Sequence, residues 1–194
     1  MTKNQLINIT AEPFAKGAER ACYQHPDDEN KVIKIRFGEV NKQTRRELAI
    51  YESFAQRNMT NFQHVPQYFG KVETNLGEGM VFDLIRDFDG VISEPLYHSL
   101  RSGSPLSEFF PQLEALKQNL LDNLIVISAD IVGRHNILLQ KLSPATSKLV
   151  IVDGIGNHSA INWLDNFRYF GQKKINRRWS RLYTRLEQYA KGER

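Results

Sequence analysis

The sequence predicts an α+β fold in which an antiparallel sheet with one inserted helix precedes a mainly helical half. The first third of the chain alternates short β-like runs with turn-forming stretches, whereas the last third repeats apolar residues at helical spacing. The chain has 194 residues, 41% of them hydrophobic and 25% charged. This length suits one large domain or two small lobes around a shared cleft.

The N-terminal half accounts for the predicted sheet. Turn-forming residues at 15–20 and 25–30 separate its first strands. A helix is expected from about 42 to 57, because Leu48, Tyr51 and Ala55 recur at helical spacing. The strands expected around this helix are residues 6–9 (LINI), 21–24 (ACYQ), 31–37 (KVIKIRF), 67–74 (QYFGKVET) and 79–86 (GMVFDLIR).

A break at 87–90 (DFDG) marks the expected boundary between a lobe at 1–87 and a lobe at 88–194. The second lobe begins with an amphipathic helix at 106–124, with Ser107 as its expected cap and Pro111 in its first turns. Short β-like runs follow at 124–127, 136–142 and 148–153, and the chain is expected to be mostly helical from about 160.

Composition excludes several classes of protein. No apolar stretch reaches the roughly 18–20 residues of a transmembrane helix, and the opening MTKNQLINIT lacks the hydrophobic region of a secretory signal. The single cysteine, Cys22, cannot form an internal disulfide, which favours a cytoplasmic location. The five histidines are scattered without HExxH spacing, which argues against a dedicated zinc site.

The C-terminal residues carry most of the positive charge. Between Arg168 and Arg194 nine Lys or Arg stand against two Glu, so this tail has a net charge of +7 and the rest of the chain −3. An anionic partner at a basic C-terminal helix would explain the asymmetry, whether phosphate groups, nucleic acid or a membrane surface. A solvated helix face beside an acidic neighbour is the more ordinary explanation of the same asymmetry.

Lys34 is the first residue along the chain whose position indicates a binding site for an anion. It sits in mid-strand among β-branched residues, where an ammonium group is costly to bury unless an anion meets it. Glu47, early on the expected helix, is the candidate anion. The alternative is an edge strand that leaves Lys34 in solvent. Upstream, the turn at Gly17 could hold phosphate oxygens on its backbone amides, although an ordinary hairpin explains it too.

Asn136 and Asp153 stand at matching places on two later strands. Asn136 begins the run NIL, and Asp153 ends the run LVIVD before a flexible Gly-Ile-Gly. Each alone would be an ordinary turn residue. Together they present two oxygen donors at converging strand ends, which is what a Mg²⁺ ion that bridges phosphates needs from a protein.

The order of these features resembles the protein-kinase-like superfamily. In detail, the stretches RRELAIYESF, GKVET, DFDG, NIL and DGIG are similar to the YrbL family of PhoP regulatory network proteins, over roughly residues 10–180. The resemblance implies a bilobal protein-kinase-like fold with an antiparallel-sheet N-lobe, one helix in that lobe and a truncated, mainly helical C-lobe.

The resemblance also implies ATP and Mg²⁺ as cofactors. Lys34 would hold the α- and β-phosphates, and Glu47 would pair with Lys34. Asn136 and Asp153 would bind the metal. The backbone of Gly17 and Ala18 would cover the phosphates, and the hinge facing the adenine would be formed by Phe82, Asp83, Leu84 and Ile85.

The chain departs from the kinase pattern at the catalytic base. Kinases place an aspartate five positions before the metal-binding asparagine, but here that position is Ile131, and Asp130 lies one residue further away. Either a bulge brings Asp130 into place or the base is absent. The 41 residues after Asp153 contain no Ala-Pro-Glu segment, so the peptide-docking half of an ordinary kinase is expected to be missing.

Three functions remain open at this point, the third of which is the binding of nucleic acid or an anionic surface through the basic tail at 168–194. The first is an ATP-dependent phosphotransferase in which Lys34, Glu47 and Asp130 are catalytic and the acceptor is a small molecule, a lipid-linked sugar or a protein. The second is a non-catalytic module of the same fold that senses nucleotide or binds a regulatory partner.

Overall fold

Two antiparallel sheets and the helices beside them make up the described part of the chain. The structure is a computed structural model that describes residues 6–17, 19–38, 42–128, 131, 133–156 and 168–193. The larger sheet has the strand order β1-β2-β3-β5-β4. Its strands are β1 (Ala15–Lys16), β2 (Arg20–His25), β3 (Asp28–Arg36), β4 (Tyr68–Thr74) and β5 (Gly77–Asp83).

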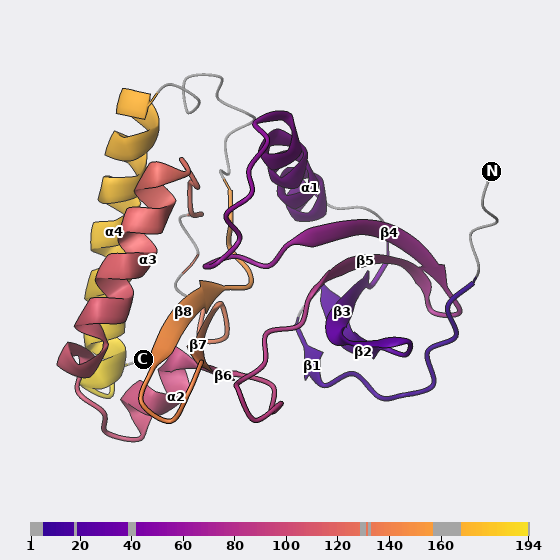
Figure 1. Ribbon diagram of the computed structural model, residues 1–194, viewed down its shortest axis with the longest axis horizontal. Helices are drawn as coiled ribbons and strands as arrows, with labels where there is room; N and C mark the ends of the chain where they lie inside the picture. The colour runs from indigo at the N-terminus through magenta and orange to yellow at the C-terminus, as the bar shows by residue number, and fades with distance from the viewer. Residues whose placement is uncertain are drawn as a thin grey trace.

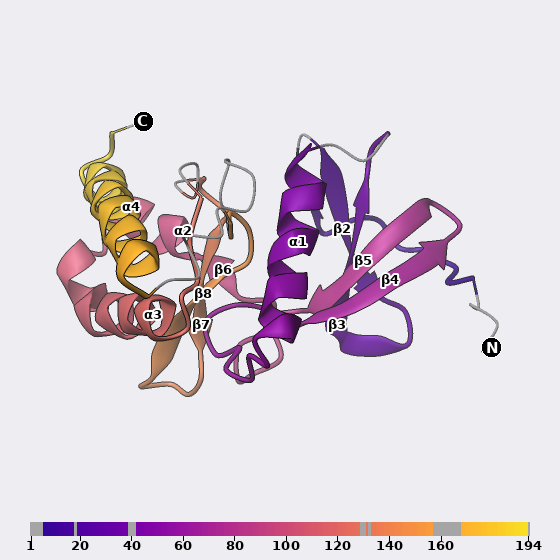
Figure 2. The ribbon, with the colours of Figure 1, turned by 90° about the horizontal axis from the view of Figure 1, so that it is seen from above.

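A single helix, α1 (Lys42–Gln56), connects β3 to β4. Figure 2 shows α1 between the five-stranded sheet and the rest of the chain. Its buried residues Glu47, Tyr51 and Phe54 recur at intervals of four and three, which is the period of one helix face. The ring of Tyr51 packs against the sheet, 5.2 Å from Phe82 between ring centroids, and Phe54 packs edge-on against Tyr51 at 5.4 Å.

The second half combines a small sheet with three α-helices in its described residues. The strands β6 (Glu94–Pro95), β7 (Ile137–Lys141) and β8 (Ser147–Ile151) pair in that order. The helices are α2 (Leu96–Arg101), α3 (Phe110–Asp122) and α4 (Arg168–Ala190), with a 3-10 turn, η1 (Leu106–Phe109), leading into α3. Figure 1 shows α3 and α4 side by side, and β8 packs against α3.

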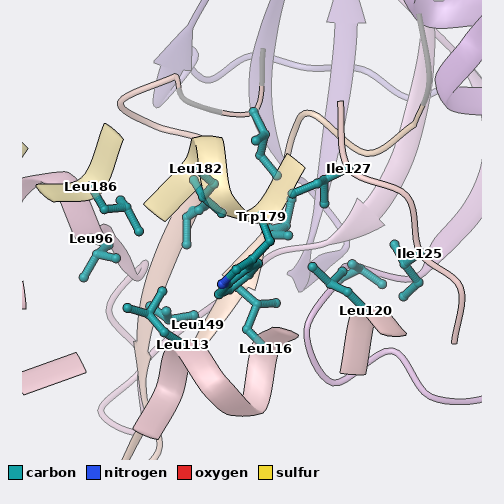
Figure 3. Packing of buried hydrophobic residues seen from close by; sticks show 14 of the residues in the cluster. Leu96, Leu113, Leu116, Leu120, Ile125, Ile127, Leu149, Trp179, Leu182 and Leu186 are labelled. Carbon is teal, nitrogen blue, oxygen red and sulfur yellow. The ribbon is translucent and has the colours of Figure 1, made fainter. Parts of the chain in front are cut away.

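A hydrophobic core runs from the five-stranded sheet through α1 into the helices of the second half. It joins Val32 and Phe82 of the sheet to Leu116 of α3 and Trp179 of α4. Figure 3 shows the Trp179 ring among leucines of α3 and α4. Because apolar area removed from water stabilises by about 25 cal/mol per Å², this shared core fixes the two halves against each other.

The α+β class and the antiparallel sheet are confirmed, and so is the helix expected at 42–57. The helix expected at 106–124 is divided, because η1 precedes α3 and Pro111 falls in the first turn of α3. Residues 148–153 and 136–142 correspond to β8 and β7. The expected boundary at residue 87 stays a prediction. Among the described residues, no helix is both long and apolar enough to cross a bilayer.

Two expected strands are wrong. Residues 6–9 contribute a single bridge from Ile7 to Thr74, because the side chain of Asn75 takes the hydrogen bonds of the Ile9 backbone that a strand partner would make. Residues 124–127 likewise contribute one bridge, Ile127 to Ile155. The edges of the five-stranded sheet are β4 and β1, and β1, beside β2, is only two residues long and carries no detectable period.

A buried arginine ties α4 to the two loops that flank the small sheet. Arg178 is 7% exposed and its guanidinium donates to the carbonyl oxygens of Ile127 and Gly156, the latter at 3.1 Å. Those two segments also bond directly, from the Ser128 amide to the Gly154 carbonyl at 2.7 Å. Helix α4 therefore holds the segment that follows Asp153 against the segment that leads to residue 129.

Replacing Arg178 should destabilise the fold far more than replacing its neighbour. We expect Arg178→Met to lower the free energy of unfolding by about 2–6 kcal/mol, because two carbonyl oxygens lose a donor at about 1–3 kcal/mol each. Arg177→Met, on the exposed side of the same helix, should change it by less than about 0.5 kcal/mol. Urea denaturation measures both values, and equal losses would contradict the assigned role of Arg178.

Candidate functional site

Lys34 lies in the interior of the sheet with its ammonium group buried. β3 is flanked by β2 and β5, and Lys34 pairs across them with Cys22 and Met80. Its side chain is 8% exposed, and Nζ donates to the Val152 carbonyl oxygen at 2.8 Å. The edge-strand alternative is therefore wrong. The alternation of β3 sends Ile33 and Ile35 to the opposite face, into a separate apolar cluster.

Glu47 is the anion that meets Lys34. Its Oε1 lies 3.5 Å from Lys34 Nζ, and its side chain is 9% exposed. The helix period places Glu47 on the same buried face of α1 as Tyr51, so the packing of that face aims the carboxylate at the sheet. The ring of Phe82 lies below the ammonium, 4.5 Å from Nζ to the ring centroid. The pairing expected from the sequence is thus present.

Arg20 is a site residue that the sequence reasoning missed. From the start of β2 its guanidinium contacts Glu47 Oε2 with one nitrogen and Asp153 Oδ1 with another, the latter at 3.0 Å. Its side chain is 12% exposed. Burial by itself would lower the pKa of Arg20, but the charges of Glu47 and Asp153 outweigh it and raise that pKa above its ordinary value.

A signal for Arg20 was present in the strand alternation. Cys22 lies directly opposite Lys34, so the two share one face of the sheet. Arg20 stands two residues before Cys22 and therefore has the same orientation as Lys34. The strand expected at 21–24 began one residue too late to include it.

Asn136 and Asp153 lie at the same end of the β7–β8 hairpin. Ile137 pairs with Ile151, and the Val152 amide donates to the Asn136 carbonyl oxygen at 2.9 Å, so Asp153 is the next residue beyond that pairing. The Asp153 side chain is 35% exposed, and its Oδ1 also accepts the Gly154 amide at 2.7 Å. Burial favours its neutral form, yet Arg20 and Lys34 hold the pKa of Asp153 below its ordinary value.

Asn136 keeps its amide group available. It is half-buried, and among the described residues its side chain makes no hydrogen bond. A Cβ atom at position 133 would lie 2.7 Å from Asn136 Nδ2, so the glycine at 133 leaves the space that this amide fills. One oxygen of Asp153 also lies outside these contacts, so the two residues at this end of the hairpin offer two oxygen donors, a number that suits Mg²⁺ bound together with phosphates. No group of three or more His, Cys, Asp or Glu side chains gathers as a metal cluster in the described part of the chain.

The segment expected to form a hinge has one unused donor. The backbone amide of Asp83 donates to the carbonyl oxygen of Gln67 at 3.1 Å, and the backbone amide of Leu84 donates to the carbonyl oxygen of Asn30 at 2.8 Å. In the described structure the amide of Ile85 donates to no acceptor, although its carbonyl oxygen accepts the Ser93 amide at 3.0 Å. Ile85 is thus the residue of this stretch whose backbone N–H is free for a ligand.

The glycine turn is only partly described. The Gly17 amide donates to the Arg20 carbonyl oxygen at 2.9 Å, which closes the turn between β1 and β2. The expected phosphate-covering residue Ala18 and the expected base Asp130 both lie outside the described residues. Whether a bulge moves Asp130 toward Asn136 therefore stays a prediction.

Helix α1 packs directly on the segment that carries Asp153. Gly156 has φ +113°, and a Cβ atom there would collide with the side chain of Ile50. Glycine is the residue that adopts this φ without strain, and it also lets Ile50 approach the backbone. The position of α1, and hence of Glu47, is therefore coupled to the Asp153–Gly156 segment.

Comparison with known proteins identifies relatives over nearly the whole chain. The model of the family described as PhoP regulatory network protein YrbL matches residues 7–187. The "Uncharacterized protein YrbL" of Escherichia coli (strain K12) is 33% identical over 184 residues, which cover 91% of this chain and 86% of that protein. The protein of the same name in Shigella flexneri matches with the same identity and coverage.

Neutralising Glu47 should destabilise the protein, because Arg20 and Lys34 would share one buried acceptor fewer. We expect Glu47→Gln to lower the free energy of unfolding by about 3 kcal/mol, the cost of breaking a buried ion pair. The matched control is Glu52→Gln, an exposed glutamate of the same helix, which should change it by less than about 0.5 kcal/mol. Urea denaturation of both variants checks this. An unchanged free energy of unfolding in Glu47→Gln would mean that the ion network does not stabilise the fold.

Proposed function

This chain belongs to the YrbL family of PhoP regulatory network proteins, and we propose that it is a compact protein-kinase-like phosphotransferase that binds ATP with Mg²⁺. The observation that carries the proposal is the buried pair of Lys34 on β3 and Glu47 on α1, set beside Asp153. A lysine that bonds the backbone next to an aspartate, and is oriented by a helix glutamate, matches the phosphate-binding arrangement of kinases.

The order of elements supports a kinase-like bilobal arrangement. Strands β1 to β5 with α1 inserted after β3 would form the N-lobe, up to about residue 87. The small sheet and helices α2 to α4 would form a shortened C-lobe. The hairpin β7–β8 then presents Asn136 and Asp153 toward Lys34 from the C-lobe side, as the Lys34 bond to Val152 supports.

Each residue has a defined role in this proposal. Lys34 binds the α- and β-phosphates, and Glu47 fixes its ammonium in position. The amide of Ile85 donates to the adenine. Asn136 and Asp153 would hold Mg²⁺, which when bound neutralises charge on the β- and γ-phosphates. Because phosphoryl transfer depends mostly on positioning and charge stabilisation, this set carries most of the expected rate even with a displaced base.

A second function is favoured by two features of the same site. Ile131 occupies the place of the kinase base relative to Asn136, and Arg20 already neutralises Asp153. Both features suit a non-catalytic module that binds nucleotide and signals through a partner.

The acceptor of the phosphotransferase would be a small molecule, a lipid-linked sugar or a protein site.

Nucleotide binding should stabilise the protein against heat. With Mg·ATP at about 100 times its dissociation constant, the gain is about 2.7 kcal/mol. For a chain of this size that corresponds to a melting temperature about 5–10 °C higher. Lys34→Met and Asp153→Ala should lose the shift, while Lys71→Met, which removes an exposed lysine of β4, should keep it. A wild type without any shift would contradict both nucleotide-binding functions.

Turnover separates the two functions. If the chain is a phosphotransferase, ADP should form from ATP, and Asp130→Asn should slow its release by about 10²–10⁴-fold, the usual contribution of a general base. Asp89→Asn, an exposed aspartate, serves as the control and should leave the rate unchanged. Binding of ATP without formation of ADP would favour the non-catalytic module. An unchanged turnover rate in Asp130→Asn would show that Asp130 is not the general base.

A further inference from the structure

We infer that Arg20 sets the divalent-cation affinity of this site: its guanidinium holds Asp153 until phosphate oxygens draw it away and release the carboxylate for the metal. The inference deepens the proposed nucleotide binding and rests on it. Arg20 thereby becomes a specificity-determining residue, which makes the metal bind with the triphosphate rather than alone.

The geometry places Arg20 in competition with a metal ion. One guanidinium nitrogen lies 3.0 Å from Asp153 Oδ1. Mg²⁺ binds carboxylate oxygen at about 2.0–2.1 Å, so an ion on that oxygen would stand within about 5 Å of the guanidinium nitrogen, and an ion on the other oxygen of the carboxylate only slightly further away. Two cations at that distance in a poorly solvated site repel each other strongly. Arg20 therefore has to move from Asp153, or the ion binds weakly.

The charges of the site balance without a metal and become positive with one. Arg20 and Lys34 face Glu47 and Asp153, two cations against two anions in mutual contact. A divalent cation alone adds an excess of two positive charges to this nearly buried group. A triphosphate brings negative charge that offsets this positive excess, so metal and triphosphate should bind cooperatively.

Arg20 is also placed to contact the phosphates once it leaves Asp153. It lies at the start of β2, directly after the turn that the Gly17 amide closes. A planar guanidinium matches phosphate oxygens with paired donors. The other guanidinium nitrogen of Arg20 donates to Glu47. The guanidinium can therefore exchange the Asp153 carboxylate for a phosphate while it stays bound to α1.

The alternative is that Arg20 only stabilises α1 through Glu47. In that case its removal lowers the stability of the fold and leaves metal binding unchanged. Metal affinity measured without nucleotide separates the two roles, because a purely structural ion pair predicts no gain of binding when it is removed.

The experiment titrates Mn²⁺ alone into the full chain and follows free Mn²⁺ by electron paramagnetic resonance. We expect Arg20→Met to bind Mn²⁺ about tenfold more tightly than the wild type, a typical coupling between sites. Asp153→Asn in the Arg20→Met background should abolish the gain. Arg36→Met is the matched control. Arg36 lies on β3 directly opposite Arg20 in the strand pairing and forms no ion pair in the described structure. Its removal should leave the Mn²⁺ affinity unchanged.

A second variant keeps the test decisive if Arg20→Met does not fold. Arg20→Lys retains the charge, but a single ammonium cannot contact both carboxylates as the guanidinium fork does. We expect it to show a smaller gain in Mn²⁺ affinity. In both variants ATP should tighten Mn²⁺ binding less than in the wild type.

Mn²⁺ affinities of both variants equal to that of the wild type, with Mg·ATP still stabilising the wild type, would overturn the inference and leave the proposed function in place. A wild type that Mg·ATP does not stabilise would overturn the proposed function, and the inference with it.

Discussion

The buried ammonium group of Lys34 is the constraint on which the rest of the structure depends. A cation that is 8% exposed in the middle of a sheet persists only where anions and carbonyl oxygens meet it. Glu47 and the Val152 carbonyl oxygen provide these contacts, and Arg20 binds the remaining oxygen of Glu47. Four segments that are distant in the sequence therefore converge: β2, β3, α1 and the end of β8. Any displacement of one segment leaves a buried charge without its partner.

The apolar packing around this network keeps its members in place. Ile50 of α1 rests on Gly156, so the helix that carries Glu47 and the segment that follows Asp153 cannot shift independently. Arg178 holds the same segment to α4 through the Gly156 carbonyl oxygen. The ionic site is thus fixed from the sheet side by strand pairing and from the helical side by the shared core. A ligand that changes the position of α1 would therefore also change the position of Asp153.

Sequence reasoning could predict the parts of the site that follow from a period. Strand alternation isolated Lys34 from its apolar neighbours, helical spacing located α1, and the order of the late strands brought Asn136 and Asp153 together. It could not find β1 or β6, because a two-residue strand has no period. Arg20 was missed because the strand expected at 21–24 began one residue after it, and because its partners Glu47 and Asp153 lie far away in the sequence. Asp130 lies outside the described residues, so its place relative to Asn136 stays a prediction.

The central claim is that Lys34 faces the phosphates of a bound nucleotide. The most direct measurement uses an acyl-phosphate derivative of ATP, which transfers its acyl group to a lysine beside the phosphate chain. Peptide mass spectrometry should find the label on Lys34, and an excess of Mg·ATP should prevent it. Labelling confined to exposed lysines such as Lys71 and Lys173, or labelling of Lys34 that ATP does not reduce, would contradict the claim.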